Sequence, residues 1–272
     1  MQRRRFLALC GAGALGTAGA AVTRAFGSAP GRAAPGPPPP PGLELPVTGV
    51  RRIVWSVPTD DRVIALTFDD GPTTELTPRI LDILEDFRVP ATFMVMGYNA
   101  VRHAGMLEDA VAAGHEIGNH TWSHRHLRHE SPEATYREIE QGARSIEVIT
   151  GRPTRFFRPP QGEFTTDAVR SAAALDHDVV LWSVERREPA GTAPRRLAEG
   201  YIRRTAPGDI VLLHDGYGRG TFAPEADWAE RLHRRRAEEL AALPGILAGV
   251  RAAGLRFVRL SELLDRAKEA SA

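Results

Sequence analysis

The fold is decided by the stretch Val63-Ile64-Ala65-Leu66-Thr67-Phe68-Asp69-Asp70-Gly71-Pro72. Its first six residues form a near-continuous apolar run, which is typical of a strand covered on both faces of a parallel sheet. Two adjacent carboxylates follow directly, and a Gly-Pro pair ends the strand. In barrels of parallel strands the active site is built at the carboxyl ends of the strands. The stretch therefore predicts both a fold class and a place for chemistry.

Working outward, short apolar runs alternate with amphipathic segments along the rest of the chain. Strands are predicted at residues 63–68, 91–96, 116–118, 156–158, 179–184, 210–213 and 255–260. Helices are predicted at residues 77–87, 132–150 and 226–253, the last one broken near Pro244. Thr77-Pro78 and Ser131-Pro132 look like an N-cap residue followed by the first helical turn. Seven strand–helix units favour a distorted (β/α)7 barrel, although periodicity alone is also compatible with an open sheet.

Length and composition exclude several classes of protein. The chain has 272 residues, 42% of them hydrophobic and 25% charged, with a net charge of +1. These values are those of a soluble globular protein and exclude a disordered, collagen-like or multi-span membrane chain. The charge balance gives no indication of nucleic-acid binding. We expect one catalytic domain over residues 50–266, and no feature predicts an oligomeric state.

The N-terminal part has the pattern of an export signal followed by a spacer. Arg3-Arg4-Arg5-Phe6-Leu7 is similar to the twin-arginine motif, and a weakly apolar run follows it. That run is too short and too rich in glycine to predict a stable membrane span. We expect residues 1–29 to be the signal, 30–49 a Pro/Gly-rich linker and 267–272 a tail. Cys10, the single cysteine, excludes an intramolecular disulfide.

Polar clusters follow four of the predicted strands. They are Asp69-Asp70-Gly71-Pro72, Asn119-His120-Thr121-Trp122-Ser123-His124, Arg158-Pro159-Pro160-Gln161-Gly162 and His214-Asp215-Gly216. Because the carboxyl ends of parallel strands share one face of a barrel, we expect these clusters to converge. His120 and His124, with one carboxylate of the Asp pair, would make a three-ligand site with open positions, which is typical of a catalytic metal. Such a donor set suits Zn²⁺, and also Fe²⁺, Co²⁺ or Mn²⁺.

The motifs Thr67-Phe68-Asp69-Asp70-Gly71-Pro72, His120-Thr121-Trp122-Ser123-His124, Arg158-Pro159-Pro160-Gln161-Gly162 and Leu212-Leu213-His214 resemble those of the polysaccharide deacetylases, the NodB-homology proteins of carbohydrate esterase family 4. They occur in the family's order, and the resemblance extends over residues 62 to about 264. It implies a distorted (β/α) barrel and a divalent metal, zinc before cobalt, manganese or nickel. The substrate it implies is an N-acetylated polysaccharide.

The resemblance also implies a role for each matching residue. Asp70, His120 and His124 would hold the metal. Asp69 would be the general base, Arg158 its charged tether and His214 the general acid that protonates the departing amine. A backbone N–H near Gln161 would stabilise the oxyanion, Leu212 would line the acetyl pocket, and Trp182 would contact substrate.

Two departures from the family pattern affect the expected substrate more than the expected reaction. Gln161 stands where the family usually has Tyr. The family's Asp-x-x-Asp-Trp motif is replaced by a stretch in which Glu185 and Glu188 take the places of the aspartates and Pro189 that of the Trp. We expect Glu188 to tune Arg158 or His214.

Other polar features have simpler interpretations. The remaining histidines are expected at the surface or at strand ends. The run Arg231-Leu232-His233-Arg234-Arg235-Arg236 is expected on a solvated helix face, with the pairs Glu230/Arg234 and Arg235/Glu239 at i,i+4 spacing. The loop Gly216-Tyr217-Gly218-Arg219-Gly220 contacts substrate or is a flexible turn.

The sequence therefore predicts a secreted, metal-dependent hydrolase that removes N-acetyl groups from peptidoglycan or a chitin-like polymer. An O-acetyl esterase acting on xylan or another glycan would use the same site. A carbohydrate-binding protein without catalysis and a non-haem iron oxygenase are further alternatives. The complete set of metal, acid and base residues opposes the former, and the βα alternation with the paired Asp69-Asp70 opposes the latter.

Overall fold

The computed structural model describes residues 52–269, with side chains through Arg266. The predicted export signal, Cys10, the linker, the expected domain start at Val50 and the last residues of the tail lie outside this range. In the described part of the chain no helix is both long and apolar enough to cross a lipid bilayer.

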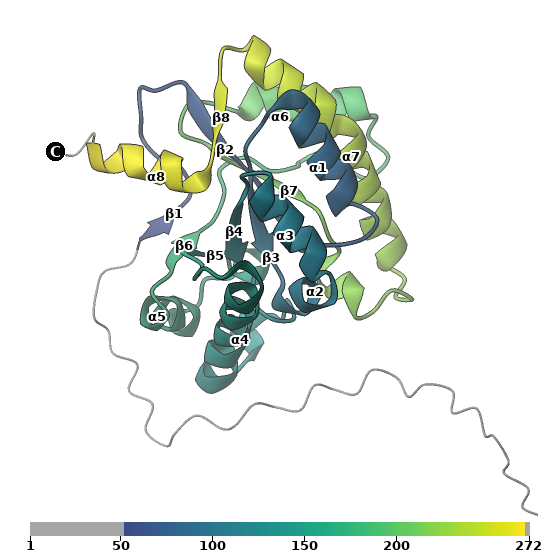
Figure 1. Cartoon of the computed structure of the whole chain (residues 1–272). Coiled ribbons are helices and arrows are strands. Elements are labelled where there is room, and N and C mark those ends of the chain that lie inside the picture. Colours follow the sequence, from purple (N-terminus) through teal and green to yellow (C-terminus); the bar gives the residue numbers. More distant parts are fainter. Residues whose placement is uncertain (1–51, 270–272) are drawn as a thin grey trace, which may run out of the picture. The chain divides into compact units, whose positions relative to one another are not determined.

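The centre of the fold is one parallel sheet whose strands are surrounded by helices (Figure 1). Its strands are β1 (Ile53–Val54), β2 (Val63–Asp69), β3 (Thr92–Val95), β4 (Glu116–Asn119), β5 (Phe156–Phe157), β6 (Asp178–Val180), β7 (Ile210–His214) and β8 (Arg256–Val258). They follow the order β1-β6-β5-β4-β3-β2-β7, and β8 also pairs with β2. All seven predicted strands are present, and among residues 52–269 the short β1 is the one strand that was not predicted.

The α-helices are α1 (Thr77–Phe87), α2 (Gly97–Arg102), α3 (Ala104–Ala112), α4 (Pro132–Thr150), α5 (Thr166–Ala174), α6 (Pro194–Arg204), α7 (Ala229–Ala252) and α8 (Leu260–Glu269). Short 3-10 turns are η1 (Leu127–His129), η2 (Pro160–Gly162) and η3 (Gly218–Thr221). Helix α4 packs against β4 and helix α7 against β7, and α7 also packs against both α1 and α6.

The sheet closes only loosely, which makes the barrel a distorted one. Between the β6 side and β7 the chain has a single parallel bridge from Val184 to Val211, and Leu212 donates its backbone N–H to the Val184 carbonyl at 2.8 Å. A second bridge joins Ser56 to Asp209. Together with the parallel strands and the helices around them, this seam confirms the expected distorted (β/α)7 architecture.

Two details of the predicted helices were wrong. Helix α7 is not broken at Pro244 but continues through it, since a proline removes one backbone donor without necessarily ending a helix whose face is buried. Helix α1 has Leu76, not Thr77, at its N-cap position, with no side-chain cap. Ser131 does cap α4, because its hydroxyl accepts from the Ala134 N–H at 3.2 Å.

Candidate active site

Asp69 is the last residue of β2, and a buried guanidinium fixes its carboxylate. Arg158, which is fully buried at the end of β5, donates to Asp69 Oδ1 at 2.6 Å and to Thr67 Oγ1 at 2.9 Å. Its remaining donors bond the carbonyls of Val180 at 3.1 Å and Leu181 at 2.9 Å. With donors bonded to four different oxygens, Arg158 holds the Asp69 carboxylate in one orientation, and the expected contact between these two side chains is present.

Asp70 faces both predicted histidine ligands. Its Oδ1 lies 3.5 Å from His120 Nε2 and 3.2 Å from His124 Nε2, and the ligand atoms of the three residues lie within 4.8 Å of one another. Asp70 has a left-handed backbone, φ 80°, and its carbonyl accepts from the Asn99 side chain at 2.8 Å. That unusual backbone turns the carboxylate away from the strand and toward the imidazoles.

The residues of this triad fit a divalent cation. Asp70 Oδ1 is buried and has no hydrogen-bond donor, a costly arrangement that a cation would relieve. His120 Nδ1 lies 2.7 Å from the Arg158 carbonyl; donating its proton there leaves Nε2 as a free lone pair. Burial lowers the pKa of His124 to about 4, so this ring is neutral at pH 7 and able to ligate.

The neighbours of Asp70 also favour its ionised form by lowering its pKa. Burial alone would raise the pKa of Asp70, but His124, His120 and Arg236 outweigh it and hold the pKa well below its usual range. Burial likewise lowers the pKa of His120, yet the neighbouring Asp69 and Asp70 raise it overall. Because a ligating imidazole must be neutral, a bound cation would oppose this upward shift of the His120 pKa.

His214 ends β7 directly beside Asp69, because the two residues are register partners on neighbouring strands. Its Nδ1 lies 3.1 Å from Oε2 of Glu239, a residue of α7 that is 2% exposed. The predicted contact of Glu188 with Arg158 or His214 does not form. Glu188 instead accepts from Arg204 at 2.8 and 3.1 Å, and this pairing lowers its pKa.

Sequence reasoning missed two site residues on α7. Arg236 donates to Asp70 Oδ2 at 3.1 Å and to the Gly216 carbonyl at 2.9 Å, and Glu239 bonds His214. The expected pair Glu230/Arg234 is present at 3.2 Å, but Glu239 turns inward and does not pair with Arg235 in an exposed i,i+4 contact. The sequence signal that could have found them is helical spacing, because Arg236 and Glu239 share the buried side of α7 with apolar residues that include Leu240, Leu243, Leu247 and Val250.

The three residues predicted to contact substrate lie around this centre with different exposure. Gln161 is exposed in η2 with φ 58°, and its side-chain Nε2 lies 3.1 Å from His126 Nε2. Trp182 is partly buried, and the guanidinium carbon of Arg158 lies over its ring, 5.7 Å from the ring centroid. Leu212 is buried within β7, and its carbonyl accepts from the Tyr201 hydroxyl at 3.1 Å.

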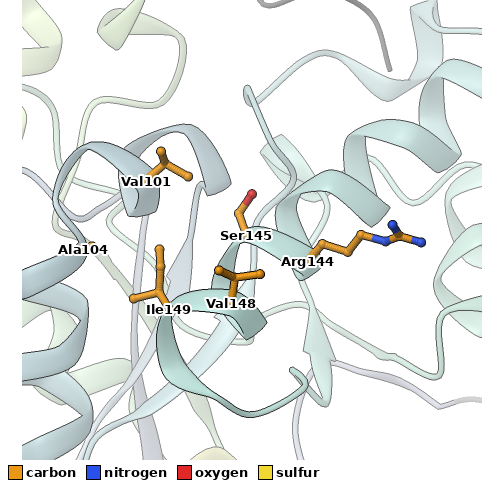
Figure 2. Close-up of a pocket in the computed structure, with 6 residues that line it drawn as sticks. All are labelled: Val101, Ala104, Arg144, Ser145, Val148 and Ile149. Atoms are coloured by element: carbon orange, nitrogen blue, oxygen red, sulfur yellow. The ribbon is translucent and has the colours of Figure 1, made fainter. Parts of the chain in front are cut away.

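A loop glycine closes over the triad. A Cβ added at Gly218 would lie 3.0 Å from Asp70 Oδ1 and 3.1 Å from His124 Cε1. The glycine-rich loop after β7 therefore reaches the metal-ligand atoms themselves. By contrast, an apolar pocket between α2–α3 and α4 holds none of the predicted site residues (Figure 2). It is lined by Val101, Ala104, Arg144, Ser145, Val148 and Ile149.

Comparison with known proteins adds independent evidence. The family profile described as polysaccharide deacetylase matches residues 56–180. A peptidoglycan-N-acetylglucosamine deacetylase of Bacillus cereus is 34% identical over 223 residues, which cover 81% of this chain and 96% of the relative. A chitooligosaccharide deacetylase of Bradyrhizobium is 37% identical over 177 residues, which cover 65% of this chain and 80% of the relative.

A solved structure is similar over most of the fold. That of the peptidoglycan deacetylase PdaC from Bacillus subtilis matches with a TM-score of 0.65 and 27% identity, covering 78% of this chain and 95% of that one. The sequence similarity extends over nearly the whole of the B. cereus relative, and the fold agrees with it. The chain belongs to the polysaccharide deacetylase family, also known as the NodB-homology or carbohydrate esterase family 4 proteins.

Proposed function

We propose that this protein hydrolyses the N-acetyl groups of N-acetylglucosamine units in peptidoglycan or chitin-like oligomers. The observation that carries the proposal is the grouping of Asp70, His120 and His124, with Asp69 Oδ2 only 3.7 Å from His120 Nε2. A cation site, a tethered carboxylate and a histidine on the next strand are the groups that amide hydrolysis requires. The peptidoglycan and chitooligosaccharide deacetylases among the relatives support this choice of substrate.

Each residue of the site has a separate role in the proposed hydrolysis of the amide. Asp69 accepts a proton from the attacking water as the new C–O bond forms at the acetyl carbon. A divalent ion held by Asp70, His120 and His124 would supply Lewis-acid polarisation of the carbonyl and the water. The backbone N–H near Gln161 donates to the developing oxyanion. His214 then gives a proton to the nitrogen as the C–N bond breaks, so that acetate and a free amine leave.

We also propose zinc as the native metal and export by the twin-arginine route, which would place the enzyme at the cell wall or outside the cell. The two-histidine, one-carboxylate donor set supports zinc, with cobalt, manganese or nickel as substitutes. Arg3-Arg4-Arg5-Phe6-Leu7 supports export. Metal analysis of the purified protein and fractionation of expressing cells test the two proposals.

Acetate release tests the reaction. The full chain is assayed on N-acetylglucosamine oligomers and on peptidoglycan as purified, after metal removal, after metal restoration, and as Asp69→Asn. We expect release that disappears with the metal, returns with it, and falls by about 10²- to 10⁴-fold in the variant, the range for loss of a general base.

Two results would contradict the proposal. Release by the metal-free protein would exclude the metal site from catalysis. No release from either polymer by the metal-loaded protein would move the function to O-acetyl esters, or to glycan binding if ester cleavage is also absent.

A further inference from the structure

Helix α7 inserts a carboxylate next to the proposed acid. Glu239 is 2% exposed, and its Oε2 lies 3.1 Å from His214 Nδ1. Its other oxygen, Oε1, has no hydrogen-bond partner. Burial would raise the pKa of Glu239, but His214, Arg236 and Arg186 outweigh burial and lower it, so the carboxylate is ionised. A buried, ionised carboxylate next to one ring nitrogen holds that N–H, orients the ring and stabilises the imidazolium form that a general acid uses.

Among the described residues, three other glutamates were expected near His214 or lie next to Glu239 in the sequence, and none of them bonds His214. Glu185 is exposed, and Glu188 is paired with Arg204. Glu238, one residue before Glu239 on α7, is paired with Arg186 instead. Arg186 also bonds the carbonyl oxygens of Glu188 and Arg235, each at 3.0 Å, and so attaches the segment after β6 to α7.

We propose that Glu239 is the positioning residue of the reaction: it accepts from Nδ1–H of His214, and this directs the second N–H of the protonated ring, at Nε2, toward the substrate nitrogen. The inference rests on the proposed function. In this proposal Glu239, on α7, has the role next to His214 that the sequence analysis expected of Glu188, in the segment after β6. Glu239 acts through His214 and touches no reacting atom.

Through Arg236, helix α7 also contacts the proposed metal ligands. Arg236 lies 3.1 Å from Asp70 Oδ2 and 3.7 Å from Glu239 Oε2. One turn of α7 therefore contacts both the metal-ligand carboxylate and the carboxylate behind the acid. The position of His214 relative to Asp70 is set by this helix as well as by the pairing of β2 with β7.

A positioning role makes a selective prediction about leaving groups. An amide nitrogen leaves only when protonated, whereas an aryl oxide leaves without a proton. In metal-loaded Glu239→Gln we expect kcat on N-acetylglucosamine oligomers to fall by about 10²- to 10⁴-fold, as for other losses of general acid–base catalysis, with KM nearly unchanged. With 4-nitrophenyl acetate the change should stay within about threefold, since the acid contributes little there.

Matched variants separate positioning from folding. Glu238→Gln removes the same charge one residue away and should retain the acetate-release rate of the unmodified enzyme. Glu239→Gln should bind one zinc per chain with unchanged affinity, as measured by titration. In the background of His214→Ala, Glu239→Gln should have no additional effect, because the two residues act as a unit.

Several results would overturn the inference. Equal losses on the amide and the aryl ester, an additive double variant, or an unchanged amide rate in Glu239→Gln would each do so. If the unmodified protein cleaves only esters, the proposed function fails, and a series of alkyl and aryl acetates still tests Glu239. Its replacement should then slow the alkyl esters, whose leaving groups need a proton, far more than the aryl esters.

Discussion

The two oxygens of Asp70 face different groups, and this division shapes the site at the scale of single residues. Oδ2 accepts from Arg236, while Oδ1 has no donor and faces both imidazoles. Gly218 lies over that second oxygen with φ 51°, in the left-handed region that favours glycine. A side chain at position 218 would occupy the space next to the ligand atoms.

Gly218→Ala should therefore weaken metal binding. The added methyl would contact Asp70 Oδ1 and His124 Cε1 at 3.0 and 3.1 Å, so we expect the zinc affinity measured by calorimetric titration to fall by about 10- to 100-fold. Gly114→Ala is the matched control, because Gly114 also has a positive φ, 86°, but open space around it. Equal zinc affinities in the two variants would show that Gly218 does not shape the site.

At the scale of elements, α4 holds the loop that carries both histidines. The Asn119 side chain donates to the Ile139 carbonyl at 2.8 Å, and the Trp122 N–H donates to the Glu138 carbonyl at 2.8 Å. The Glu138 carboxylate accepts from the backbone and the hydroxyl of Ser123, at 2.9 and 2.8 Å. The spacing of His120 and His124 thus depends on how closely α4 approaches β4.

Gly142 permits that approach, and its replacement should disturb the histidines from a distance. A Cβ at position 142 would lie 2.4 Å from Asn119 Oδ1 and 2.8 Å from the Thr121 backbone. For Gly142→Ala we expect about 1–3 kcal/mol less unfolding free energy, the usual cost of overpacking, together with weaker zinc binding. Urea unfolding and zinc titration measure the two effects.

Gly105→Ala on α3 is the control, because a Cβ there meets nothing within 4 Å. The unfolding free energy of this variant should rise by about 0.5–1 kcal/mol, since alanine is the better helix former. A Gly142→Ala protein as stable as Gly105→Ala would mean that α4 can shift without cost.

The elements also show where sequence reasoning succeeds. The convergence of the polar clusters that follow β2, β4, β5 and β7 was predictable, because each cluster lies next to its own strand and the carboxyl ends of parallel strands meet on one face. Arg236 and Glu239 were not predicted, because their contacts depend on how α7 is rotated against the sheet. The i,i+4 spacing of Arg235 and Glu239 is equally compatible with an ion pair on a solvated face. The nearby apolar positions Leu240 and Leu243 indicate instead that Glu239 faces the interior.

At the scale of the whole molecule, the barrel gathers residues between positions 69 and 239 into one ionisable network. Its stability therefore depends on pH. His115 offers the most direct readout, since it is separate from the network. It precedes β4, its Nδ1 accepts from the Ala91 N–H at 3.2 Å, and its ring packs edge-on to Phe93 at 5.4 Å.

Burial lowers the pKa of His115 from its usual value of 6.5, so the folded state binds a proton less readily than the unfolded chain. The stability contributed by its neutral form is complete above pH 6.5 and is lost as the pH falls toward the folded-state pKa. One proton changes the unfolding free energy by at most about 1.4 kcal/mol per pH unit. In His115→Asn, where the amide oxygen can still accept from Ala91, the unfolding free energy should fall less between pH 7.5 and 5.5 than in the unmodified protein. Parallel curves from urea unfolding across this range would contradict the assignment, because the lost ring packing costs the same at every pH.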